Sequence, residues 1–199
     1  MIRLATTLLG ACTLISLPLI GNQEPASAKN QPCCSTEAST STATLASLPS
    51  STAPQLDQIK SLVGDWYEVG DDGKPSETLV SSYRVTAGGH AVIETLFPGS
   101  EHEMISIYHM DGGDLLLTHY CVLGNAPTYR AERSDAGLVW RCQGAHNLAR
   151  HGDAHMHEGH TQFVDKNRIV GKWLQTVDGE VSYTAEFDLV RVQNKATQQ

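Results

Sequence analysis

Two pairs of side chains that can bind a transition metal stand out in the sequence, each at a spacing of two residues. His119 precedes Cys121, and His155 precedes His157. Alternate residues of a β-strand point to the same face of a sheet, so each pair can present its ligand atoms together. Imidazole and thiolate groups bind both Zn²⁺ and Cu. The pattern therefore predicts a candidate site for Zn or Cu with the ligands His119, His155 and His157, and with Cys121 beside them.

The same residues allow two other interpretations. Nine histidines are present, and five of them lie within residues 146–160, which is also typical of solvated loop histidines that bind no metal. His119 beside Cys121 could instead serve as the general base of an enzyme. The sequence alone leaves these interpretations open.

His119 lies in a stretch, residues 102–127, that is expected to form a β-hairpin. Two apolar runs rich in Ile, Leu, Tyr and Thr flank Gly112 and Gly113. Glycine readily adopts the positive φ angles of a tight hairpin turn. A hairpin centred on these two glycines aligns Ser106 with His119, so we expect a cross-strand hydrogen bond between them.

The chain from residue 56 to residue 192 is predicted to be an all-β domain. No helix in it is long enough for a crossover, so about ten short strands should follow one another as an antiparallel meander. Such a sheet avoids exposed edges by closing into a barrel, and a β-sandwich is the alternative. A short helical turn at residues 56–62 precedes the first strand. Outside the hairpin, the predicted strands are residues 66–69, 79–85, 90–97, 129–133, 138–142, 155–164, 168–177 and 181–192.

The last predicted strand alternates between apolar and polar residues. This alternation is typical of a strand with one buried face. The residues expected to point inward are Val181, Tyr183, Ala185, Phe187 and Leu189.

Two cysteines of the barrel region are predicted to remain unpaired. With short turns, Cys121, Tyr129 and Cys142 fall in one row across three adjacent strands. The two cysteines would then be separated by twice the strand spacing of about 4.8 Å. A disulfide needs Cα atoms closer than about 7 Å, so a bond between them is not expected.

The N-terminal residues 1–28 are predicted to be a secretory signal peptide. An apolar stretch at residues 4–20 is followed by Ala26-Ser27-Ala28, a small-residue cleavage site. Secretion or export to a periplasm is therefore expected, and a membrane span is not. A lipoprotein attached through Cys12 is the less favoured alternative.

Residues 29–55 are rich in Ser, Thr, Ala and Pro and contain few large apolar side chains. Such a segment buries too little surface to offset the entropy lost on ordering, which predicts a disordered linker. Cys33 and Cys34 are adjacent in it, and the sequence does not say whether they pair. Residues 193–199 are expected to be a C-terminal tail.

The charge of the chain favours small ligands over nucleic acid. The net charge is −8 and no run of Lys or Arg is present, which argues against nucleic acid and anionic membrane surfaces as partners. Small molecules or metal cations are expected instead. Glu94, Glu101 and Glu103 are expected to form a solvated rim.

Several motifs resemble those of lipocalin-like (calycin) barrels. Gly64-Asp65-Trp66 is similar to the Gly-x-Trp motif that opens the first strand in those families. The longer runs at 94–99, 103–127 and 147–157, and the segment with Trp173, Asp178 and Gly179, resemble a group of secreted or cytosolic bacterial lipocalin-like proteins of unknown function. The resemblance implies a barrel over about residues 60–191, with Arg191 packed across Trp66. It supplies no activity, and Cys142 departs from the pattern.

Three functions are consistent with these observations. The leading one is a secreted protein that holds a small apolar or amphipathic ligand in the barrel. The second is a barrel that binds a metal or haem through His119 and the pair His155 and His157, since some lipocalin-like barrels hold haem through a histidine. The third is an enzyme with His119 and Cys121 in its pocket. The candidate ligand-binding residues are Met104, Tyr108, Leu117, His119, Cys121 and Tyr129.

Overall fold

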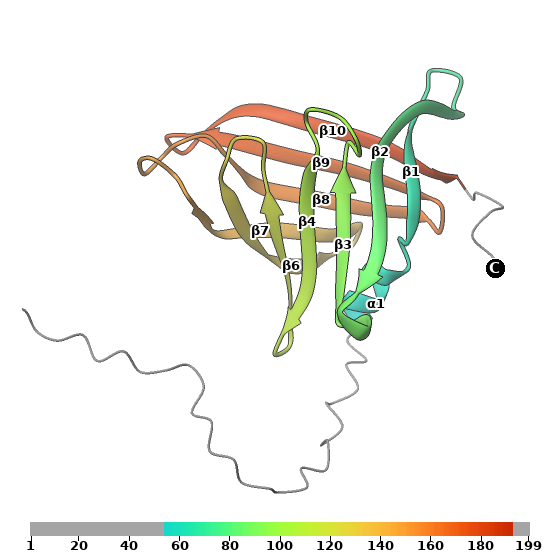
Figure 1. The fold of residues 1–199 in the computed structure, drawn as a ribbon, viewed down its shortest axis with the longest axis horizontal. Helices are drawn as coiled ribbons and strands as arrows, with labels where there is room; N and C mark the ends of the chain where they lie inside the picture. The colour runs from blue at the N-terminus through green and yellow to red at the C-terminus, as the bar shows by residue number, and fades with distance from the viewer. Residues whose placement is uncertain (1–53, 193–199) are drawn as a thin grey trace, which may run out of the picture. The chain divides into compact units, whose positions relative to one another are not determined.

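The computed structural model describes residues 54–192, which form a closed antiparallel barrel of ten strands (Figure 1). The all-β fold and its closure confirm the prediction of a barrel rather than a sandwich. The expected signal peptide, most of the linker, the C-terminal tail and Cys12, Cys33 and Cys34 lie outside the described residues. Within residues 54–192, no helix has the length and apolar character needed to cross a membrane.

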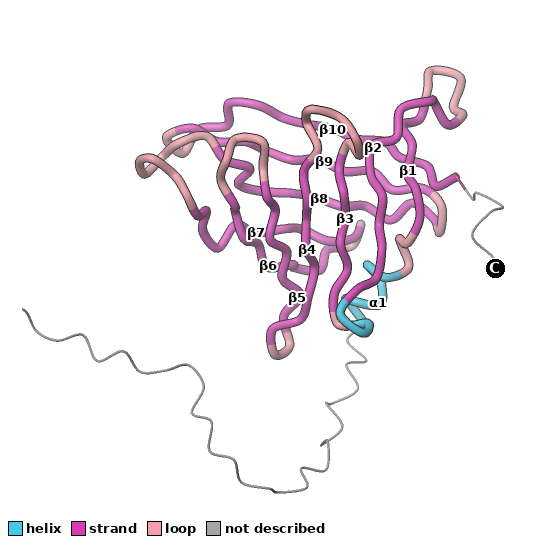
Figure 2. The backbone as a smooth tube through the Cα atoms, in the orientation of Figure 1, coloured by secondary structure: helices cyan, strands magenta, loops and turns pink. Residues whose placement is uncertain are grey.

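All ten predicted strands are present, with ends that differ by a few residues (Figure 2). The strands are β1 (Gly64–Val69), β2 (Pro75–Thr86), β3 (Ala91–Leu96), β4 (Met104–Asp111), β5 (Asp114–Tyr120), β6 (Ala126–Ser134), β7 (Gly137–His146), β8 (His155–Asp165), β9 (Arg168–Val177) and β10 (Glu180–Val192). One α-helix, α1 (Pro54–Lys60), precedes them, and a 3₁₀ turn, η1 (Ala87–Gly89), joins β2 to β3.

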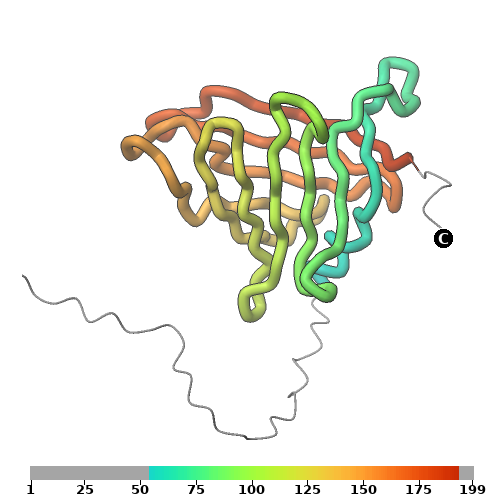
Figure 3. The backbone as a smooth tube through the Cα atoms, in the orientation of Figure 1, coloured from blue at the N-terminus to red at the C-terminus, as the bar shows by residue number. Residues whose placement is uncertain are grey.

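The chain runs as a meander in which each strand pairs with the next, and β1 pairs with β10 to close the barrel (Figure 3). Turn residues set this order locally. Gly112 has φ 57° in the β4–β5 turn, and Asp178 has φ 51° in the β9–β10 turn. The register of β4 and β5 aligns Ser106 with His119, which confirms the predicted hairpin.

Helix α1 and the residues around it close one end of the barrel. Leu56 and Ile59 of α1 are fully buried, and Trp66 has no exposed surface. The indole N–H of Trp66 donates a hydrogen bond to the carbonyl of Leu62 at 2.7 Å. The guanidinium of Arg191 lies 5.2 Å from the centre of the Trp66 ring, as the resemblance to lipocalin-like barrels implied. We call this region the closed end.

Arg191 also ties the closed end together through the backbone. Its Nη1 donates to the carbonyls of Ser61 at 2.7 Å and Val63 at 3.1 Å. The glycine of the Gly-x-Trp motif, Gly64, has φ 127°, and a Cβ there would lie 3.2 Å from Cδ of Arg191. A side chain at position 64 would therefore be strained and would crowd the arginine.

Two details of register differ from the sequence predictions. In β10, Val181 and Tyr183 are exposed rather than inward, because the pairing with β9 shifts between them. Ala185, Phe187 and Leu189 do face the interior, where they line a cavity.

The predicted row of Cys121, Tyr129 and Cys142 is only half correct. Tyr129 pairs with Cys142, but on its other side it pairs with Leu117. Cys121 instead follows β5, and its N–H bonds to the carbonyl of Asn125 at 3.0 Å. The turn between β5 and β6 is centred near residue 123 rather than near residue 125, so Tyr129 pairs with Leu117 and Cys121 lies outside the row. Among the residues that the structure describes, Cys121 and Cys142 are both unpaired, as predicted.

Candidate functional site

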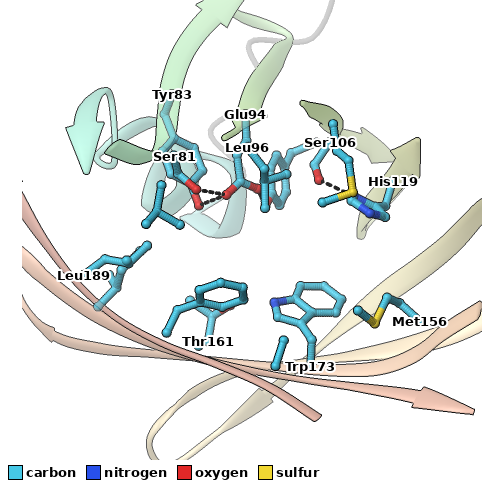
Figure 4. A pocket seen from close by; sticks show the side chains of 17 residues that line it. Ser81, Tyr83, Glu94, Leu96, Ser106, His119, Met156, Thr161, Trp173 and Leu189 are labelled. Carbon is cyan, nitrogen blue, oxygen red and sulfur yellow. Dashed lines mark hydrogen bonds between the residues drawn. The ribbon is translucent and has the colours of Figure 1, made fainter. Parts of the chain in front are cut away.

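The barrel encloses a cavity of about 80 Å³ between two walls of different character (Figure 4). One wall comes from β8, β9 and β10 and is largely apolar. The apolar side chains that line it belong to Met156, Ile169, Trp173, Ala185, Phe187 and Leu189. Thr161 and Gly171 line the same wall. The facing wall comes from β2 to β5 and carries the polar groups Ser81, Tyr83, Glu94, Ser106, Tyr108 and His119.

Trp173 forms much of the apolar wall, and a glycine makes room for it. Gly159 of β8 pairs with Trp173 of β9. A Cβ at position 159 would lie 2.5 Å from the Trp173 ring, so only glycine allows the indole to lie over this strand. Tyr129 packs against the same ring edge to face, with 5.3 Å between the ring centres.

Four polar residues lie side by side on neighbouring strands of the facing wall. Tyr83 pairs with Glu94, Glu94 with Ser106, and Ser106 with His119. Residues that are paired directly across antiparallel strands point to the same face, so all four side chains enter the barrel together. We call Tyr83, Glu94, Ser106 and His119 the polar row.

Glu94 is the centre of the polar row. Its carboxylate accepts hydrogen bonds from Ser81 Oγ at 2.7 Å, from Tyr83 Oη at 2.7 Å and from Tyr108 Oη at 2.6 Å. The residue is 7% exposed, so the expectation that Glu94 belongs to a solvated rim is wrong. Hydroxyl groups replace the water that would solvate the carboxylate, which is what burial of this group requires.

No cation accompanies Glu94. None of the ion pairs formed within residues 54–192 includes it. Burial raises the pKa values of Tyr83 and Tyr108 well above their ordinary value, and the nearby Glu94 raises both further. Both phenols therefore keep their protons at neutral pH and remain hydrogen-bond donors to Glu94.

His119 is a buried, neutral imidazole. Its Nδ1 lies 3.0 Å from Ser106 Oγ, which confirms the expected contact across the hairpin. The residue is 8% exposed, and burial lowers its pKa from 6.5 to about 4. Its Nε2 has no hydrogen-bond partner among the described residues, and the ring lines the cavity. At neutral pH this nitrogen can offer one donor or one acceptor to the cavity.

The predicted ligand-binding residues separate into two groups. Met104, Tyr108 and His119 line the cavity. Leu117 and Tyr129 are fully buried in the core but are not among the lining residues. Whether the first group binds a ligand stays a prediction.

Cys121, the remaining predicted residue, is half-buried beyond the end of β5. Within the described part of the chain it makes no hydrogen bond to His119.

Sequence reasoning missed Glu94 and Ser81, although a signal for Glu94 was present. Val92, Glu94 and Leu96 alternate in β3, so a buried face for the two apolar residues implies an inward Glu94. The three hydroxyl groups around Glu94 come from β2 and β4, and their convergence depends on the register of three strands.

The predicted metal ligands are only partly brought together. His155 and His157 are adjacent, but the third group beside them is Cys142 of β7. The potential ligand atoms of these three residues all lie within 4.8 Å of one another. His119 belongs to the polar row and lies outside this cluster, so the structure groups His155 and His157 with Cys142 rather than with His119.

Comparison with known proteins does not assign the chain to a family. No protein-family model matches the sequence, and a search of curated proteins finds no match. The functional argument therefore rests on the cavity and on the chemistry of its walls.

Proposed function

We propose that this protein is a lipocalin-like barrel that binds a small amphipathic ligand with a cationic head group. The apolar body of the ligand lies against Trp173 and Phe187, and its head group approaches Glu94. The observation that carries the proposal is the buried carboxylate of Glu94, which faces an apolar wall and forms no ion pair with any residue from 54 to 192.

The hydrogen bonds that Glu94 already accepts favour a ligand whose head group donates a hydrogen bond to this carboxylate. An ionised carboxylate has about four lone-pair sites. The hydroxyl groups of Ser81, Tyr83 and Tyr108 use three of them. Burying a charge without an opposite charge costs on the order of several kcal/mol. A ligand with a primary ammonium group would therefore be favoured over a ligand with a neutral hydroxyl group.

The cavity limits the size of the ligand. A volume of about 80 Å³ is small beside the range of roughly 300–1,000 Å³ for drug-sized ligands. Met104 and Met156 line the space, and methionine side chains are flexible enough to admit a short alkyl chain. A haem would need far more room, so the geometry does not favour haem bound through His119.

A matched series of probes tests the proposal. Hexylammonium, hexanol and hexanoate share one alkyl chain and differ in head-group charge. Calorimetric titration of the full chain should give saturable binding of hexylammonium, at least about tenfold tighter than that of hexanoate. Glu94→Gln should remove most of this preference, because the buried charge is gone. Circular dichroism checks that the variant is folded.

Glu101→Gln is the matched control, because Glu101 is exposed at the surface, where its carboxylate pairs with His102. This variant should bind hexylammonium like the unmodified chain. The proposal is wrong if none of the three probes binds, if hexanoate binds as tightly as hexylammonium, or if Glu101→Gln has the same effect as Glu94→Gln.

The proposed site of action is outside the cytoplasm. This part of the proposal depends on residues 1–28, whose apolar stretch and small-residue cleavage site predict export. The mature protein would then meet its ligand in a periplasm or in the medium.

A further inference from the structure

The geometry points to a second site on this barrel: Cys142, His155 and His157 bind one Zn²⁺ ion. This inference does not depend on the amphipathic ligand proposed above, because none of the three residues lines the cavity. The three side chains supply one sulfur and two imidazole nitrogens, a ligand set that zinc accepts readily.

The strand geometry explains why these residues meet. Strands β7 and β8 are antiparallel neighbours, and their last pair joins Arg141 to Glu158. Cys142 and His157 are the next residues along each strand. The pairing of β8 with β9 shifts between Met156 and Glu158, which makes His157 a bulge. Bulges locally redirect side chains, and this one lies at the cluster, where His155 and His157 are two residues apart in β8.

The backbone fixes the tautomer of His155. Its Nδ1 lies 2.8 Å from the carbonyl oxygen of Asp153. A carbonyl only accepts hydrogen bonds, so Nδ1 carries the proton and Nε2 of the neutral ring has a free lone pair. Metal-binding histidines are typically oriented by such a bond from the other ring nitrogen. His155 Nε2 is the atom that faces His157.

The spacing of the two nitrogens is close to that of a tetrahedral site. His155 Nε2 and His157 Nδ1 are 3.1 Å apart. Zn–N bonds of about 2.0–2.1 Å at a tetrahedral angle place two nitrogens roughly 3.3 Å apart. Without metal, the proton on His157 Nδ1 can join the two rings by a hydrogen bond. The two nitrogens therefore already lie close to the separation that the ion requires.

The binding step balances without any oxidant or reductant. The Cys142 thiol releases its proton to solvent and its sulfur bonds to Zn²⁺. His157 moves its proton from Nδ1 to Nε2 through water, which frees Nδ1 for the ion, and His155 Nε2 binds unchanged. One proton is released in total, and water takes the fourth position.

Cobalt titration tests this site directly, because Co²⁺ bound to a thiolate gives a sulfur-to-metal charge-transfer absorption band. The protein is the full chain with Cys12→Ser, Cys33→Ser and Cys34→Ser, kept reduced by a phosphine. We expect one Co²⁺ per chain, with the thiolate band, and displacement by one Zn²⁺. Cys142→Ser should remove the band, and His155→Ala and His157→Ala should each weaken binding at least about tenfold.

Matched controls separate this site from adventitious binding. Cys121→Ser and His146→Ala should leave the band and the affinity unchanged, since neither residue belongs to the cluster. Because His157 is exposed, His157→Ala should fold normally and report on binding even if Cys142→Ser does not fold. Absence of the band, its persistence in Cys142→Ser, or its loss in Cys121→Ser would each overturn the assignment.

Discussion

The closed end of the barrel and the cavity bury polar groups in opposite ways. At the closed end, Trp66 donates to a backbone carbonyl and Arg191 donates to several. In the cavity, Glu94 has no cation and Nε2 of His119 has no partner within residues 54–192. The closed end is complete by itself, whereas the cavity has hydrogen-bonding capacity left for another molecule. The difference suggests that one region supports the fold and the other supports binding.

The largest effect on stability is expected when the indole of Trp66 is removed from the closed end. Trp66→Ala should lower the free energy of unfolding by about 3–5 kcal/mol, because it leaves a cavity in the core and removes the contact with Arg191. Urea denaturation measures the change. Tyr183→Ala is the control, since Tyr183 is 56% exposed and should change stability little. Similar losses in both variants would contradict a structural role that is specific to the closed end.

An intermediate effect is expected from the titration of His119 in the polar row. Burial lowers its pKa from 6.5 to about 4, so the unfolded chain binds this proton more tightly than the folded chain. The stability from the neutral imidazole is fully present above about pH 6.5 and is lost as the pH falls toward 4. From pH 7 to pH 5 the loss should be about 2 kcal/mol.

His119→Gln isolates this effect, because glutamine keeps hydrogen-bonding capacity but does not titrate. Urea denaturation of both proteins at pH 7 and pH 5 gives the difference in pH dependence. If the variant loses as much stability as the unmodified chain over this range, His119 is not the group responsible.

The smallest predicted effect concerns Arg191. Arg191→Lys keeps the positive charge but loses the planar group that reaches the carbonyls of Ser61 and Val63. Stability should fall by about 1–2 kcal/mol. Arg84→Lys is a matched control, because Arg84 is exposed and forms no ion pair within the described residues. An unchanged midpoint of thermal unfolding in Arg191→Lys would show that charge alone is sufficient at the closed end.

The parts of the fold that could be predicted depend on local sequence. The β4–β5 register followed from Gly112 and Gly113, and the start of the first strand followed from the Gly-x-Trp motif, whose resemblance to lipocalin-like barrels also implied the contact between Trp66 and Arg191. Each of these signals lies in a turn or in a short motif. Ten strands in meander order were predictable for the same reason, since each strand pairs with its neighbour in the chain.

The site could not be predicted to the same degree, because its contacts join distant strands. Glu94 meets hydroxyl groups from β2 and β4, and Cys142 of β7 lies beside His155 and His157 of β8, next to a bulge in that strand. A bulge shifts the pairing by one residue and leaves no clear mark in the sequence. The same limit explains the exposed Tyr183 of β10, which also lies at a shift in register.

The closure of the barrel has a consequence for how the chain folds. Nine of the ten strand pairings join neighbours in sequence, and only the pairing of β1 with β10 joins distant segments. Neighbouring hairpins form with little loss of loop entropy, whereas closing a long loop costs more, by an amount that grows slowly with its length. Trp66 and Arg191 are paired across this seam. The same residues that complete the closed end therefore also hold the sequence-distant strand pairing that must form last-to-first to close the barrel.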